Sequence, residues 1–99
     1  MDIKIKAIHF DATEKLESFI EKKVSKLTQF YDGILKADIV LKIVKPEAVK
    51  NKDVSIRIKI KNGDCFAEKV CDTFEEGIDL AVEALEKQLV KFKEKSRVK

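Results

Sequence analysis

The stretch VSIRIKIKNG, residues 54–63, constrains the fold more than any other part of the chain. Valine or isoleucine occupies every second position from 54 to 60, and the residues between them are polar or basic. Because successive side chains of a strand point to opposite faces of a sheet, this alternation predicts a strand with one buried face. Asn62-Gly63 is a preferred two-residue hairpin turn, so we expect the strand to pair with residues 65–71.

Two other segments read as strands. Residues 3–8, IKIKAI, alternate between apolar and polar side chains, which predicts a half-buried strand. Residues 37–44, ADIVLKIV, are more apolar, which favours a central position in the sheet. Between the second and third strands, KPEAVKNKD (residues 45–53) reads as a loop that is mobile in the free protein, because Val49 is its only apolar anchor.

Apolar residues at three- and four-residue spacing predict two amphipathic helices. The first follows two candidate N-caps, Thr13 and Asp11, the latter in a capping-box spacing with Glu14, and Asp32-Gly33 is expected to end it. Its buried stripe is predicted to be Leu16, Phe19, Ile20, Val24, Leu27, Phe30 and Tyr31. The stripe of the second, in which Gly77 weakens the first turn, is predicted to be Phe74, Ile78, Ala81, Val82, Leu85, Leu89 and Phe92.

This order of elements predicts an α+β fold, a βαβββα two-layer sandwich. A right-handed first crossover and a meander of the last three strands give a four-stranded mixed sheet with two parallel helices packed on one face. The opposite face then stays open to solvent. With 99 residues, the chain is expected to form one domain over residues 1–99.

The charges are segregated along the chain, although the formal net charge is only +3. Residues 72–86 carry acids without a base, and bases dominate from residue 87 onward. Lysines fall on one flank of each predicted helix and acids on the other, so the groove should bring a basic flank beside an acidic one and leave one basic flank outward. Dipole matching and ion pairing explain such helices without any function.

The open sheet face is predicted to be basic, with bases at Lys4, Lys6, Lys42, Arg57, Lys59 and Lys61. Lysines there could simply keep the face soluble and unpaired. A basic face, a basic loop and a basic tail together favour a polyanionic partner. Phe66 is the one aromatic candidate on that face, so recognition of RNA shape and phosphate is favoured over base stacking.

Several functional classes find no support in the sequence. Cys65, Cys71 and His9 do not have the spacing of a metal site, so we expect two buried thiols and a histidine at a strand end, with no metal and no cofactor. There is no glycine-rich phosphate loop and no nucleophile beside a base, so the chain is not expected to be an enzyme or to bind a small-molecule substrate. No apolar run is long enough to cross a bilayer, and we expect a cytoplasmic protein without membrane contact.

Three segments, IHFDATEKLESFIEKKVSKLTQFYDGI, ADIVLKIV and DTFEEGIDLAVEALEKQLVKFKEK, together with the Asn-Gly hairpin resemble the ribosome hibernation-promoting factor family, also called ribosome-associated inhibitors or sigma-factor modulation proteins. The resemblance implies a non-enzymatic protein that binds small-subunit rRNA and ribosomal proteins in the mRNA and tRNA channel of the decoding region. It would inhibit translation and stabilise idle ribosomes in stationary phase or stress.

Carried over to this chain, the resemblance implies rRNA contacts from Lys22, Lys23, Lys26, Lys87, Lys91 and Lys93, to which the open sheet face adds Arg57 and Lys59. Glu75 and Ala84 depart from the family pattern and make the first half of the second helix less basic. The length suggests a short form without the domain that pairs ribosomes. The rival hypothesis is a protein–protein module that regulates a transcription or stress factor through the acidic flank of the second helix.

Overall fold

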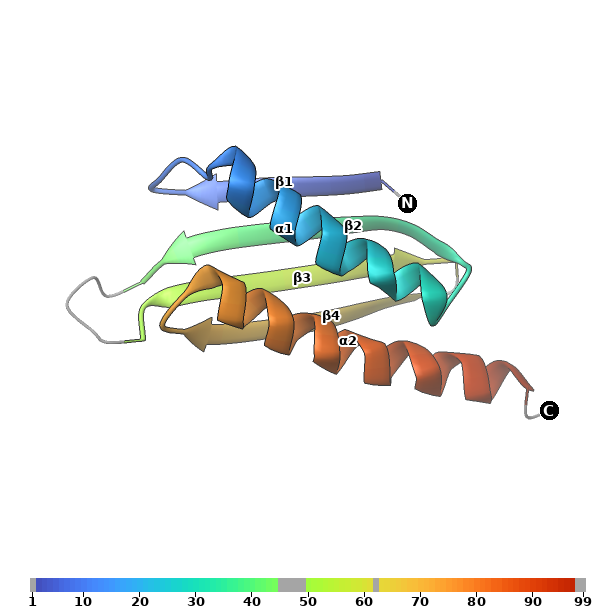
Figure 1. The fold of residues 1–99 in the computed structure, drawn as a ribbon. Helices are drawn as coiled ribbons and strands as arrows, with labels where there is room; N and C mark the ends of the chain where they lie inside the picture. The colour runs from blue at the N-terminus through green and yellow to red at the C-terminus, as the bar shows by residue number, and fades with distance from the viewer. Residues whose placement is uncertain (1, 45–49, 62, 98–99) are drawn as a thin grey trace.

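Two helices lie side by side on one face of a four-stranded sheet, and no helix of the described residues covers the other face (Figure 1). The computed structural model describes residues 2–44, 50–61 and 63–97. The elements in chain order are β1 (Asp2–Ile8), α1 (Glu14–Ser25), the 3-10 helix η1 (Lys26–Gln29), β2 (Ile34–Ile43), β3 (Lys52–Ile60), β4 (Gly63–Cys71) and α2 (Phe74–Arg97). The predicted α+β fold with βαβββα order is confirmed.

The sheet is mixed, with the strand order β1-β2-β3-β4. β1 and β2 are parallel, whereas β2–β3 and β3–β4 are antiparallel. β2 therefore lies inside the sheet, as its apolar sequence predicted. Ile60 pairs with Gly63 at the β3–β4 turn, which fixes the register along the whole hairpin.

The core lies between the sheet and the helices, and alternation in the strands supplies half of it. Val54, Ile56, Ile58 and Ile60 of β3 are essentially inaccessible to solvent. The predicted helix stripes supply the other half, as Ile20, Val24, Leu27, Ile78, Leu85 and Leu89 are also inaccessible. Burial of this apolar area is the main favourable term in folding and fixes which flanks of the helices remain at the surface.

The first helix begins after one of its two predicted N-caps and ends earlier than predicted. Thr13, not Asp11, is the N-cap, and its Oγ1 accepts a hydrogen bond from the backbone N–H of Leu16 at 3.1 Å. The α-helix ends at Ser25 rather than at Asp32-Gly33, because the chain tightens into η1, and the backbone N–H of Phe30 then bonds the carbonyl of Leu27 at 3.0 Å. The expected glycine stop is wrong: Gly33 does not adopt a left-handed conformation.

Gly77 has a packing role that the sequence did not reveal. A Cβ at this position would lie 2.7 Å from Cγ2 of Val54, which is fully buried in β3. Glycine therefore allows the start of α2 to approach the sheet closely, which offsets its low helix propensity.

The turn after β1 brings the starts of the two helices together. His9 follows the strand directly, as predicted, with a left-handed φ of 71°. This turn directs the chain so that the rings of Phe10 and Phe74 stack with centroids 4.8 Å apart.

Part of the loop predicted at residues 45–53 lies outside the described residues, as do Asn62 of the hairpin and the last two residues. At the end of that segment the prediction was wrong, because β3 already begins at Lys52. Among the helices described, neither has the length and hydropathy to cross a membrane.

Candidate nucleic-acid interface

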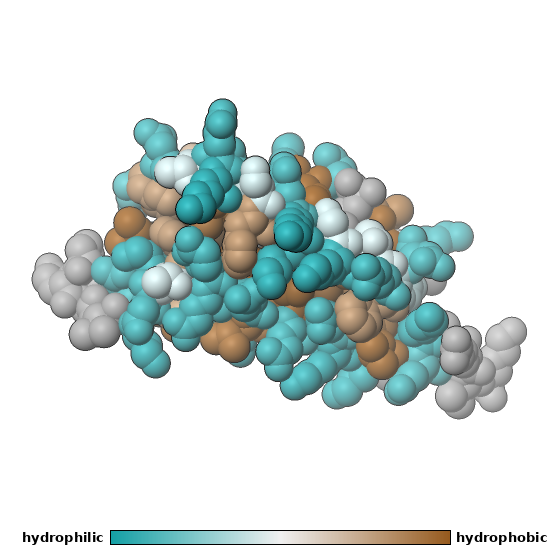
Figure 2. Space-filling view, in the orientation of Figure 1, coloured by the Kyte–Doolittle hydropathy of each residue, from teal (hydrophilic) through white to brown (hydrophobic). Residues whose placement is uncertain are grey.

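The helix-covered face is charged and polarised along the molecule. α1 and α2 run in the same direction (Figure 1), and each has acids in its first turn. Basic residues follow toward the C-terminal ends, so both helices place positive charge toward the same end of a molecule that measures 50 × 23 × 17 Å. The space-filling view in Figure 2 shows this face largely covered by hydrophilic side chains, with hydrophobic patches between them.

The predicted meeting of a basic flank with an acidic flank is confirmed in the groove between the helices. Nζ of Lys23 on α1 lies 3.1 Å from a carboxylate oxygen of Asp79 on α2, and 5.6 Å from the centroid of the Phe19 ring. The groove around this pair has a volume of about 580 Å³ and is lined by Lys23, Lys26, Asp79, Val82, Glu83, Glu86 and Lys87. Lys23 is thus partly neutralised by its partner helix.

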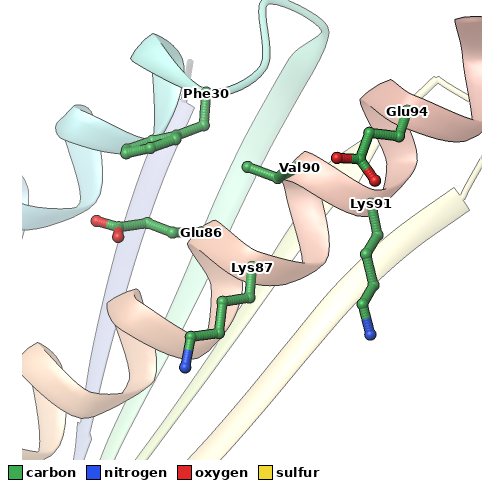
Figure 3. Close-up of a pocket in the computed structure, with 6 residues that line it drawn as sticks. All are labelled: Phe30, Glu86, Lys87, Val90, Lys91 and Glu94. Carbon is green, nitrogen blue, oxygen red and sulfur yellow. The ribbon is translucent and has the colours of Figure 1, made fainter.

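Five other predicted lysines keep their charge available. They are exposed and form no ion pair among the residues that the structure describes: Lys22, Lys26, Lys87, Lys91 and Lys93. In Figure 3 the side chains of Lys87 and Lys91 project away from η1, so they form the outward basic flank of α2. Lys93 lies apart from this flank and lines the surface beside Phe30 and Tyr31.

Beyond Lys26 the groove adjoins an apolar pocket that the sequence analysis missed. It has a volume of about 470 Å³ and is lined by Phe30, Glu86, Lys87, Val90, Lys91 and Glu94 (Figure 3). Phe30 was assigned to the core stripe, but its side chain is only half-buried. The spacing of Glu86, Val90 and Glu94 at four-residue intervals on one side of α2 was the available signal.

The open sheet face is not the basic surface that was predicted. Cross-strand register places acids beside the bases, and Arg57 of β3 forms an ion pair with Asp64 of β4 at 2.9 Å. Within β2, Lys36 forms an ion pair with Asp38 at 3.6 Å. By alternation, the bases on this face of the strands are Lys4, Lys6, Lys36, Lys42, Arg57 and Lys59, and the acids are Asp2, Asp38, Asp53, Asp64 and Glu68. The face is therefore close to neutral, and only Lys59 of the two predicted contacts lacks an ion pair among the described residues.

Phe66 lies on this face at the edge strand β4, as predicted, and is 45% exposed. The guanidinium of Arg57 lies 5.1 Å from its ring centroid. The side-chain amide of Gln88 accepts a hydrogen bond from the backbone N–H of Phe66 and donates one to its carbonyl. These contacts fix the position of the ring on a face that otherwise carries mixed charge.

Two carboxyl groups interact at the other end of the open face. Asp53 is almost completely buried, and its Oδ1 has no hydrogen-bond partner among the described residues. A side-chain hydrogen bond with Asp53, followed by charge repulsion from it, raises the pKa of Glu68 above its usual range. Lys42, opposite Asp53 in the register, acts in the other direction.

Both cysteines are buried as predicted, and burial raises the pKa of the Cys65 and Cys71 thiols. The thiols therefore stay protonated at neutral pH and fill space in the core.

Comparisons with known proteins agree with this geometry. Residues 3–97 match the family described as sigma 54 modulation protein / S30EA ribosomal protein. The chain is 26% identical to a ribosome hibernation promoting factor of Azotobacter vinelandii over 96% of the chain and 85% of that protein. It is 28% identical to the ribosome hibernation promoting factor of Escherichia coli K12 over 96% of each.

Solved structures are similar over the same length. A ribosomal subunit interface protein from Coxiella burnetii superposes with a TM-score of 0.84 at 27% identity, covering 94% of this chain and 98% of that one. The N-terminal domain of Protein Y from Thermus thermophilus gives a TM-score of 0.81 at 29% identity, covering 93% and 99%.

Proposed function

Because the chain belongs to the sigma 54 modulation protein / S30EA ribosomal protein family, we propose that it binds the ribosome and inhibits translation. The observation that carries this function is the match of nearly the whole chain to relatives named ribosome hibernation promoting factor. The rival role, regulation of a transcription or stress factor, is not favoured by these relatives. We also propose that the protein works in the cytoplasm, that residues 1–99 form one domain and that it performs no chemistry.

We further propose that the protein occupies the mRNA and tRNA channel of the small subunit and contacts rRNA and ribosomal proteins there. The free lysines on the helix-covered face support this proposal, because phosphate groups are recognised mainly by basic side chains that are not already paired. The contacts are assigned chiefly to Lys22, Lys26, Lys87, Lys91 and Lys93. Lys23, Arg57 and Lys59 are assigned weaker roles, since the first two share their charge with carboxylates and the third lies on a nearly neutral face.

A sucrose gradient of lysates from resting cells tests this function. The protein is expected to travel with the small subunit and with whole ribosomes, and purified protein added to a cell-free translation reaction is expected to reduce synthesis. A variant with glutamine at the five free lysines should stay at the top of the gradient and lose inhibition. Wild-type protein found only at the top of the gradient would contradict the function, whereas a variant that still travels with the small subunit would contradict the site assignment alone.

A further inference from the structure

The pocket between η1 and α2 has the chemistry of a nucleobase site. Its apolar surface comes from the half-buried ring of Phe30 and from Val90, which is 38% exposed. In Figure 3 the Phe30 ring projects from η1 over the gap, and Val90 faces it from α2. A flat apolar ligand could therefore lie between an aromatic ring on one side and an aliphatic side chain on the other.

Two carboxylates flank this apolar surface. Glu86 and Glu94 lie one helical turn before and after Val90 on α2, and both line the pocket (Figure 3). Neither forms an ion pair among the described residues. No described residue donates a hydrogen bond to their oxygens, so a ligand with N–H groups at its edge can donate to them.

The charged residues around the pocket determine which ligand charge it favours. Lys87 and Lys91 line its α2 side, with amines that project away from η1, and Lys26 and Lys93 line the adjoining surfaces. Over these surfaces the bases, which also include Lys23, outnumber the acids, which also include Asp79 and Glu83, by five to four. The surroundings are therefore slightly net positive and do not favour a cationic group such as an arginine side chain of a protein partner. A planar neutral group with edge donors, attached to a phosphate, fits all three features.

We propose that this pocket binds an unstacked nucleobase, with guanine preferred, presented by the RNA that the protein contacts. Guanine has a ring N–H and an exocyclic amine side by side, and this pair matches the two oxygens of one carboxylate. Uracil has only one N–H at the corresponding edge, and adenine lacks the ring N–H. The inference rests on the proposed ribosome binding, and it adds base-specific recognition to contacts that are otherwise made to phosphate.

Free nucleotides test the pocket without the ribosome. Amide spectra of the ¹⁵N-labelled full chain are recorded while GMP, AMP, UMP or ribose 5-phosphate is added. GMP is expected to shift the signals of Phe30 and Val90 and to bind more tightly than UMP. Ribose 5-phosphate is expected to affect only residues near the lysines.

Two variants separate stacking from hydrogen bonding. Phe30→Leu keeps an apolar side chain against the core and should weaken GMP binding by about fivefold or more, because an aromatic stacking partner is lost. A double variant Glu86→Gln, Glu94→Gln should bind GMP and AMP about equally. Phe66→Leu on the open sheet face is the matched control and should leave GMP binding unchanged. The amide spectrum of each variant also shows whether it is folded.

Three results would overturn the nucleobase site. They are identical responses to GMP and ribose 5-phosphate, unchanged GMP binding by folded Phe30→Leu, or larger shifts of Phe30 and Val90 with arginine methyl ester than with GMP. The last result would assign the pocket to a side chain of a protein partner. None of these results would affect the gradient experiment, so failure of the pocket is distinguishable from failure of ribosome binding.

Discussion

The dependence of ribosome binding on salt is expected to report the number of free lysines. When a protein neutralises phosphates, the logarithm of its affinity falls by about 0.7 to 0.9 per phosphate for each tenfold rise in salt. The structure leaves five helix-face lysines without an ion pair in its described part: Lys22, Lys26, Lys87, Lys91 and Lys93. One phosphate for each gives a slope of about −3.5 to −4.5 and a loss of affinity of roughly 100- to 500-fold between about 50 and 200 mM salt.

The measurement is equilibrium binding of fluorescently labelled protein to purified small subunits at several salt concentrations. Replacing all five lysines by glutamine should remove most of the slope. A matched variant with glutamine at five other lysines, Lys4, Lys6, Lys36, Lys42 and Lys50, should change it much less, because the first four lie on the open sheet face and Lys50 lies just before β3. A wild-type slope near zero would refute phosphate binding, and an equal effect of the two variants would refute the assignment to the helix-covered face.

Three further predictions concern the scaffold. Gly77→Ala should lower the free energy of unfolding by up to about 2 kcal/mol in urea titrations, because crowding against Val54 exceeds the gain in helix propensity. Adding Val54→Ala to this variant should reduce the loss caused by Gly77→Ala. A Gly77→Ala variant more stable than the wild type would contradict the close approach of α2 to the sheet. Glu68→Gln should raise the thermal midpoint of unfolding at pH 7, and this advantage should disappear near pH 4. The reason is the raised pKa of Glu68 in the folded protein: the protonated carboxyl favours folding, and this contribution is lost as the pH rises through the folded-state pKa. An advantage that is equal at both pH values would exclude the carboxyl pair as its cause. Thr13→Ala should cost about 1 kcal/mol of stability and Thr13→Ser much less, since only alanine removes the cap of α1; equal losses in the two variants would argue against the hydrogen bond.

The fold could be predicted because its periodic signals agree with one another. The alternation in β3 and the stripe that includes Leu85 each specify a single buried face, and packing those faces together leaves few topologies. The end of α1 was harder to predict, since a 3-10 turn and an α-helical turn bury nearly the same residues, as at Leu27.

The charge of the candidate site was predicted only in part. Flanks of a helix follow from spacing alone, so the meeting of a basic flank with an acidic one could be predicted, but the sequence analysis assigned Lys23 to rRNA and did not single out its pair with Asp79. The near-neutral sheet face depends on which residues of different strands lie opposite each other. The hairpin turn could have placed Asp64 opposite Lys59, but the parallel pairing of β1 with β2 has no such local signal.

The common direction of the two helices has a consequence for how the protein meets its target. The acidic starts of both helices lie toward one end of the molecule and their basic ends toward the other, so its field resembles that of an electric dipole along the 50 Å axis. Near a polyanion, this dipole orients the protein before contact, so correctly oriented encounters are more frequent than random rotation would produce. The arrangement of the helices thus favours rapid, oriented association even though the net charge is small.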